Sequence, residues 1–125
     1  MTEFTIRALR SPEEMDAAVE LQTIYWGSDM GALVPAHMLL SLASYGGHVL
    51  GAFAEERMVG MLLGFMGTDL APETEAPAAE HLLTMSKRMV VLPEYRGKKI
   101  GEALKLEQRR IALRQRVPLV TWTFD

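Results

Sequence analysis

The stretch that decides the fold is Val90-Val91-Leu92-Pro93-Glu94-Tyr95-Arg96-Gly97-Lys98-Lys99-Ile100-Gly101-Glu102-Ala103-Leu104. It begins as an apolar strand that ends at a proline, passes through a turn rich in glycine and basic residues, and continues as a helix. The first amides of a helix have no partner inside it, and the helix dipole adds positive potential at the same place. The turn therefore predicts a site for a phosphate or pyrophosphate group. The alternative is a turn that only starts a helix.

The glycine spacing excludes two common phosphate-binding motifs. A Walker A loop needs a Gly-Lys pair followed by serine or threonine, and the dinucleotide fingerprint needs three glycines in the pattern Gly-x-Gly-x-x-Gly. Neither pattern occurs in the turn.

Outward from the turn, apolar alternation and helical spacing predict five strands and three helices. The expected elements are strand 4–9, helix 12–26, helix 35–44, strand 48–54, strand 58–66, strand 82–92, helix 99–116 and strand 118–124. Ser11, Pro12 and Glu14 supply a cap, a first residue and a capping-box glutamate for the first helix. The order β-α-α-β-β-β-α-β predicts an α/β (α+β) domain over residues 1–125, with a mixed sheet that ends in a parallel crossover.

Length and composition place the chain among ordinary globular domains. It has 125 residues, 49% of them hydrophobic and 23% charged, and it has no cysteine. Disulfides, thiolate metal sites and thiol nucleophiles are therefore excluded, and the three scattered histidines form no metal-ligand pattern. We interpret His37 and His48 as structural or surface residues. No apolar run approaches the length of a membrane span, and no secretory leader opens the chain, so we expect a soluble, cytoplasmic protein.

The charges are unevenly distributed along the chain. Ten of the 13 basic residues lie between Lys87 and Arg116, whereas 13 of the 16 acidic residues lie elsewhere. This asymmetry favours an anionic ligand at one end of the molecule. One hypothesis is a nucleic-acid-binding module that uses the basic helix, and we rank it third because no aromatic platform accompanies it. Its phosphate contacts would be Lys105, Arg109, Arg110, Arg114 and Arg116.

The run Val-x-Pro-Glu-Tyr-Arg-Gly-Lys-x-Ile-Gly, from Val91 to Gly101, resembles motif A of the GNAT superfamily of N-acetyltransferases. The order of elements resembles the N-terminal part of that domain, through the fifth strand, in a longer and poorly characterised branch. The resemblance implies the acyl-CoA N-acyltransferase fold. It also implies acetyl or acyl transfer from acetyl-CoA, without a metal, to the amine of an acceptor that the sequence does not identify.

The resemblance assigns the residues that would bind acetyl-CoA. Main-chain amides of the turn would hold the pyrophosphate, and the pantetheine arm would pair with the end of the fourth strand as an extra strand. A strand amide near Val91 would polarise the thioester carbonyl. The family usually has glycine at the position of Lys99, where a lysine adds charge but disfavours a positive φ. The implied residues are Met89, Val90, Val91, Arg96, Gly97, Lys98, Lys99, Ile100 and Gly101.

The acceptor and the catalytic groups are less well defined. Trp26 and Asp29 lie between the first two helices, where the family often forms its acceptor pocket; the alternative is that Tyr25 and Trp26 close the core. Some family members place a glutamate base where this chain has Met85, so that assignment fails. Glu80 and His81 either relay a proton through water or are solvated residues at the entry to the strand. The acidic residues of the loop over 68–79 would attract a cation or are solvated.

The family continues beyond the fifth strand with a helix and two further strands. We therefore expect a domain that is incomplete at its C-terminus, or one completed by a homo-oligomer or a partner chain. A non-catalytic CoA-binding domain is the alternative to the enzyme. Neither hypothesis includes a membrane.

Overall fold

The computed structural model describes residues 3–27 and 30–122, with the side chain of Met30 left out. Five strands form one sheet in the order β1-β2-β3-β4-β5. The strands are β1 (Thr5–Ala8), β2 (Gly47–Ala54), β3 (Arg57–Thr68), β4 (Leu82–Val91) and β5 (Val120–Trp122). Neighbours from β1 to β4 are antiparallel, and β4 and β5 are parallel. The predicted fold class and element order are confirmed.

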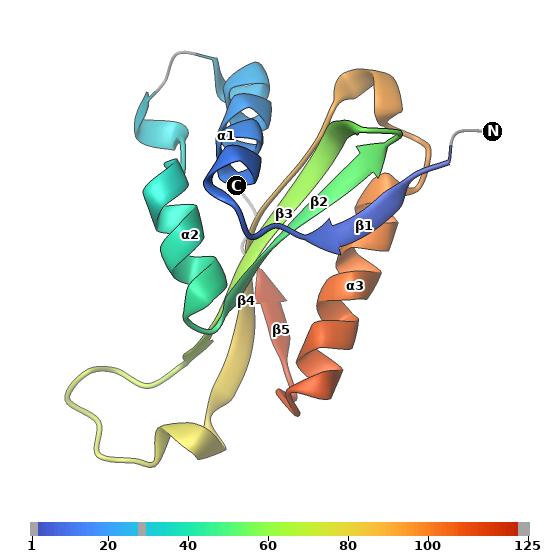
Figure 1. Cartoon of the computed structure of the whole chain (residues 1–125). Coiled ribbons are helices and arrows are strands. Elements are labelled where there is room, and N and C mark those ends of the chain that lie inside the picture. Colours follow the sequence, from blue (N-terminus) through green and yellow to red (C-terminus); the bar gives the residue numbers. More distant parts are fainter. Residues whose placement is uncertain (1–2, 28–29, 123–125) are drawn as a thin grey trace.

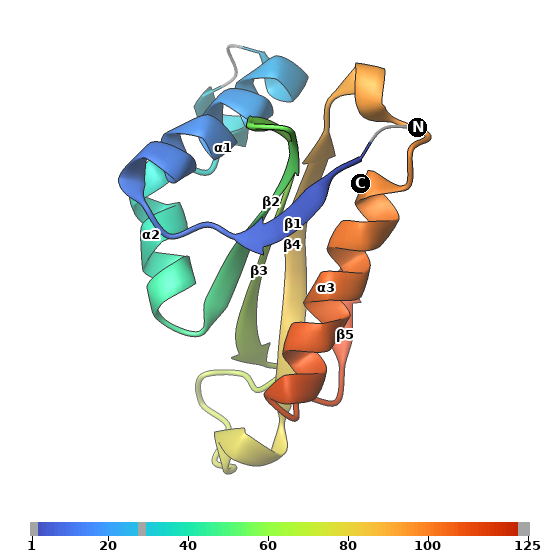
Figure 2. The ribbon, with the colours of Figure 1, turned by 45° about the vertical axis from the view of Figure 1, so that its right-hand side comes forward.

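Helices cover both faces of the sheet, as Figures 1 and 2 show. The helices α1 (Pro12–Trp26) and α2 (Ala36–Ser44) lie on one face, and α3 (Ile100–Arg114) lies on the other. Three short 3-10 turns, η1 (Met30–Ala32), η2 (Ala78–Glu80) and η3 (Pro93–Tyr95), complete the elements. The core lies between these layers and includes Leu39, Leu62 and Leu104, each completely buried.

Local chemistry explains where α1 begins. The Ser11 hydroxyl accepts from the Glu14 amide at 3.1 Å, and the Glu14 carboxylate accepts from the Ser11 amide at 3.1 Å. Both halves of the predicted capping box are therefore present. The carboxylate also accepts from the Arg10 amide, which lowers the pKa of Glu14 to about 2. The helix ends where predicted, at Gly27 with a φ of 65°.

The helix α3 buries a face that differs in part from the expected one. Helical spacing predicts a buried face made of Ile100, Ala103, Leu104 and Ile111. Of these, Ile100 and Leu104 are buried, but the other buried side chains are Gln108 and Ala112. The Gln108 amide packs against the imidazole of His48 on β2, with their Nε2 atoms 3.0 Å apart. His48 is therefore structural, one of the two roles, structural or surface, that the sequence predicts for it.

A β-bulge in β4 changes the direction of its side chains. Leu63 on β3 pairs with Arg88 and Gly64 pairs with Ser86, so Lys87 is an extra residue on β4. Beyond the bulge, Arg88 contacts the α1 side of the sheet and Met89 approaches α3.

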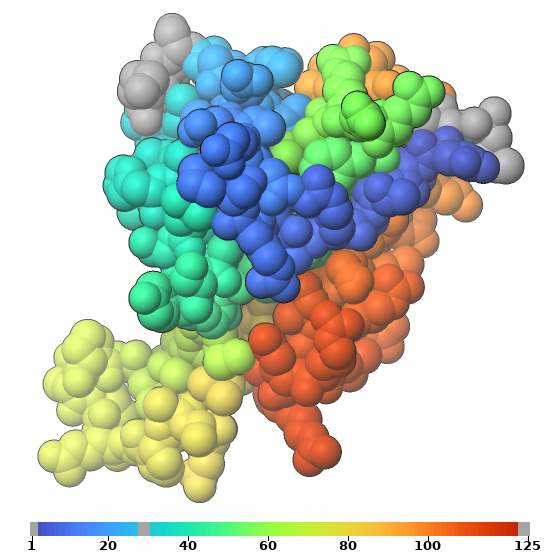
Figure 3. Space-filling model, in the orientation of Figure 1, coloured from blue at the N-terminus to red at the C-terminus, as the bar shows by residue number. Residues whose placement is uncertain are grey.

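The last strand, expected over 118–124, is observed over Val120–Trp122, and residues 123–125 lie outside the described part. Residues 69–77 form a loop that stands out from the body of the molecule at the lower left of Figure 3. No helix in the described residues is long and apolar enough to cross a membrane.

Candidate functional site

The predicted phosphate turn lies at the start of α3, next to the end of β4. Gly97 has a φ of 81°, and Lys99, the N-cap residue, has a φ of 65°. A glycine adopts this left-handed conformation at lower cost than a lysine. The backbone is therefore strained at Lys99, where the family usually has glycine. No side chain caps the helix.

The turn presents a set of main-chain amides with no protein acceptor. Ala103 is the first residue to donate into the helix, to the Lys99 carbonyl at 3.0 Å. In the described part of the chain, no acceptor contacts the amides from Gly97 to Glu102. Arg96, Lys98 and Lys99 add positive charge, opposed within the turn by the exposed Glu102. Unpaired amides at the positive end of a helix dipole favour an anion.

A hollow of about 370 Å³ lies over this turn. Six of the nine residues that the resemblance assigned to the coenzyme line it, and Tyr95 and Glu102 complete it. The six are Val91, Arg96, Gly97, Lys99, Ile100 and Gly101. Lys98 lies within the turn, whereas Met89 and Val90 lie further back on β4.

One edge of β4 beside the hollow, the open edge, has no partner strand among the described residues. The strands β4 and β5 pair only from Thr84 to Ser86 within the described residues. From Lys87 to Val91, the pairs in this part of the structure are with β3 alone. Met89 is 40% exposed, although β4 lies between β3 and β5 in the sheet. The open edge therefore begins at the bulge and leads to the turn.

On the face of the sheet that α1 covers, Arg88 of β4 stacks with the aromatic pair Tyr25 and Trp26, and sequence reasoning missed Arg88. The Arg88 guanidinium lies 4.2 Å from the ring centroid of Trp26 and donates to the Gln22 side chain at 3.0 Å and to the Ala32 carbonyl. Tyr25 contacts Trp26 edge-on with centroids 4.5 Å apart. The bulge places Arg88 on this face, and nothing in the local sequence marks it.

This stack decides between the two interpretations of the aromatic pair. Trp26 is half-buried against the core, whereas Tyr25 is 58% exposed and lines a hollow of about 200 Å³ with Val90, Val91 and Arg96. Core closure thus describes Trp26 but not Tyr25. Asp29, the other predicted acceptor residue, lies outside the described residues.

The two candidate relays lie far from the open edge. Glu80 and His81 precede β4, and His81 Nδ1 is 3.5 Å from the Asp69 carboxylate. Five residues of strand, about 16 Å, separate Leu82 from Lys87. A single water cannot join groups over that distance.

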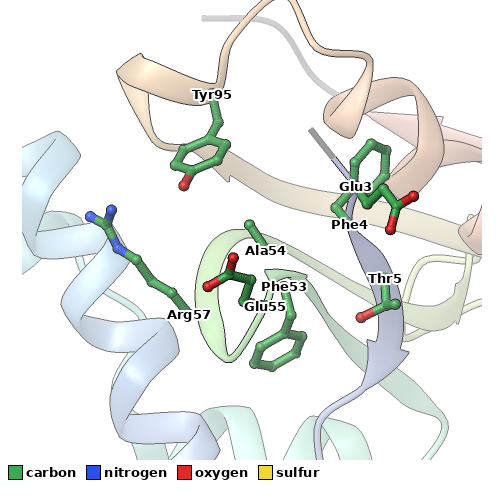
Figure 4. A pocket seen from close by; sticks show the side chains of 8 residues that line it. All are labelled: Glu3, Phe4, Thr5, Phe53, Ala54, Glu55, Arg57 and Tyr95. Atoms are coloured by element: carbon green, nitrogen blue, oxygen red, sulfur yellow. The ribbon is translucent and has the colours of Figure 1, made fainter. Parts of the chain in front are cut away.

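A larger hollow, of about 1040 Å³, is lined by residues of β1, β2 and β3 together with Tyr95. Figure 4 shows its lining by Phe53, Tyr95 and the carboxylates of Glu3 and Glu55, among other side chains. Arg57, which also lines it, is 3.7 Å from Glu94. Two carboxylates disfavour the phosphates of a coenzyme, so the smaller hollow over the turn is the better anion site.

Comparison with solved structures finds the same fold in acetyltransferases. One is an aminoglycoside acetyltransferase, meta-AAC0020, from an uncultured soil metagenomic sample, in complex with sisomicin. It superposes with a TM-score of 0.77 at 16% sequence identity, over 98% of this chain and 78% of that one. The aminoglycoside acetyltransferase AAC(6')-Iy, in complex with a bisubstrate analogue of CoA and acetylneamine, gives 0.76 at 13% identity, over 99% and 81%. A ribosomal-protein-alanine N-acetyltransferase from Brucella melitensis biovar Abortus 2308 gives 0.72 at 15%, over 98% and 81%.

No protein-family model matches the sequence, and no curated protein matches it. At 12–16% identity the likeness establishes the fold and leaves the chemistry to the residues of this chain.

Proposed function

We propose that this chain, which has the GNAT acyl-CoA N-acyltransferase fold, transfers an acyl group from a CoA thioester to an amine. The observation that carries the proposal is the run of amides from Gly97 to Glu102, which form no hydrogen bond in the described chain. All of these residues except Lys98 line the hollow, and Arg96, Lys98 and Lys99 add positive charge beside it. A pyrophosphate is the part of CoA that such a row of amides binds best.

The open edge of β4 supports the second part of the proposal. The pantetheine arm would lie along Met89, Val90 and Val91, with main-chain hydrogen bonds of the kind that an added strand makes. An amide of this edge would then polarise the thioester carbonyl. Catalysis would come chiefly from holding the amine and the thioester together.

The acceptor would approach the bulge from the α1 side, where Tyr25 is exposed above Val90 and Val91. An aromatic wall suits the apolar part of an amine substrate. Aminoglycosides are the acceptors of two of the similar proteins. The acceptor proposed for this chain is an amine.

The experiment is an assay of thiol release from acetyl-CoA with a panel of amines that includes an aminoglycoside, a peptide N-terminus and a polyamine. The proposal expects amine-dependent release and an acetylated product by mass spectrometry. Tight binding of acetyl-CoA without turnover of any amine would favour the non-catalytic CoA-binding domain. Failure to bind acetyl-CoA would refute the proposal.

The nucleic-acid hypothesis has a separate test. The α3 side chains Arg109 and Arg110 are exposed, and Arg110 is within 3.8 Å of Glu107. Duplex DNA should bind only non-specifically, at roughly 10⁻⁴–10⁻⁶ M near physiological salt. Sub-micromolar, sequence-dependent binding that Arg109→Gln weakens would support that hypothesis against the transferase.

A further inference from the structure

A lysine and a serine lie together at the point where the open edge of β4 begins. Lys105 Nζ on α3 donates to Ser86 Oγ on β4 at 2.7 Å. Ser86 is 5% exposed and immediately precedes the bulge residue Lys87. Ser86 pairs with Trp122, and this is the last β4–β5 pair in the described chain.

The ammonium group is held from two sides. Its Nζ lies 4.8 Å from the ring centroid of Trp122 on β5, a cation–π contact, and Ser86 fixes it from β4. Burial lowers the pKa of Lys105 below its ordinary value, which makes the ammonium a better acid. Lys105 therefore contacts both strands at their last described pair.

The distance from the turn to this lysine fits a pantetheine arm. From Val91 to Ser86 the strand advances about 16 Å, and the arm is close in length to about five extended residues. The hollow over the turn and a second hollow, of about 640 Å³, share Glu102, and the second is lined by Lys105 and Trp122. A path along the flank of α3 thus leads from the turn to Lys105.

We propose that Lys105, positioned by Ser86, is the acid that protonates the sulfur of CoA as it leaves. This inference rests on the proposed transferase function. The acceptor nitrogen, already neutral, forms a bond to the thioester carbonyl carbon, and the carbon–sulfur bond breaks with its electron pair going to sulfur. The sulfur takes a proton from Lys105, and the extra proton of the new amide nitrogen returns to Lys105 through solvent. No other reactant is needed.

The test measures the thiol of bound CoA and needs no acceptor. A cation beside the sulfur stabilises the thiolate, so bound CoA should ionise at lower pH than free CoA, as cysteine thiols near lysine do. We expect about tenfold more thiolate in the complex than in free CoA near pH 7, followed by thiolate absorbance. The variant Lys105→Met should remove this difference, whereas Arg110→Met, which removes a charge from the exposed side of α3, should keep it.

Two results separate this inference from the proposed function. If CoA binds but ionises equally in the wild type and in Lys105→Met, the role of Lys105 is wrong and the transferase proposal stands. If CoA does not bind the wild type, both fail. If Lys105→Met does not fold, a measurement on the unmodified protein still tests the inference. The NMR signal of the Lys105 ammonium should titrate differently with CoA than with S-methyl-CoA, which has no thiol, and identical titrations would overturn the inference.

Discussion

His48 on β2 and Gln108 on α3 form a buried polar pair between the sheet and the helix, with their Nε2 atoms 3.0 Å apart. His48 is 8% exposed and Gln108 is 1% exposed. Burial lowers the pKa of His48 from 6.5 to about 4, because the charged imidazolium would lose its hydration. The pair therefore requires a neutral imidazole.

This requirement predicts how stability depends on pH. Between about pH 6.5 and 4 the unfolded chain takes up a proton at His48 that the folded chain does not, so acidification destabilises the fold. The loss should reach about 3 kcal/mol. Urea unfolding at a series of pH values measures it. The pKa of Glu14 lies near 2 when folded and at 4.5 otherwise, so its contribution to the pH dependence overlaps this window only below about pH 4.5.

His48→Gln should flatten the stability profile between pH 6.5 and 4.5, and His37→Gln, at an exposed position of α2, should leave it unchanged. An identical slope in the wild type and in His48→Gln would contradict the burial argument.

The glycine beneath the pair gives a second prediction. A Cβ at Gly64 would lie 2.5 Å from His48 Nε2 and 2.6 Å from Gln108 Nε2, whereas a Cβ at Gly67, on the same strand, would meet nothing within 4 Å. Gly64→Ala should cost about 1 to 3 kcal/mol of unfolding free energy. Gly67→Ala should be nearly neutral. Equal midpoints of urea unfolding for the two variants would show that the pair is not packed as described.

The strained lysine of the turn gives a third prediction. Lys99 has a φ of 65°, at a cost of about 1 to 2 kcal/mol, and glycine avoids that cost but loses about 0.5 to 1 kcal/mol in conformational entropy. Lys99→Gly should therefore raise the unfolding free energy by about 0.5 to 1 kcal/mol. Lys98→Gly, whose φ is not positive, should lower it. Thermal unfolding of both variants measures the difference, and destabilisation by Lys99→Gly would argue against the left-handed turn.

The sequence was sufficient for the features that depend on neighbours along the chain. Ser11, Pro12 and Glu14 mark the start of α1 because a capping box is complete within four residues. The turn before α3 was found in the same way, since a strand, a proline, glycines and a helix follow one another directly. Its coenzyme role remains a proposal.

The features that depend on distant residues were not predictable. The bulge at Lys87 arises from the register between β3 and β4, and a one-residue shift leaves no mark in the sequence. Nothing beside Gln108 in the sequence marks it as buried, because His48, 60 positions earlier, completes its buried contact. Lys105 was counted with the basic surface of the helix, whereas Ser86 on β4 and Trp122 on β5 hold it between the two strands.

The central claim is that the turn binds the pyrophosphate of CoA, and Gly101 allows the most direct test. Its Cβ would meet only the flexible end of Met89, at 3.2 Å from Cε, so a side chain fits with a small adjustment. Asparagine and aspartate have nearly the same shape, and an acid in the first turn does not weaken the helix. They differ in the charge that they place beside the amides.

Calorimetric titration measures the affinity of each variant for acetyl-CoA. Gly101→Asn should bind within a few-fold of the wild type, and Gly101→Asp should bind at least about tenfold more weakly, a loss of about 1.4 kcal/mol. Equal affinity in the two variants, or no binding by the wild type, would contradict the claim.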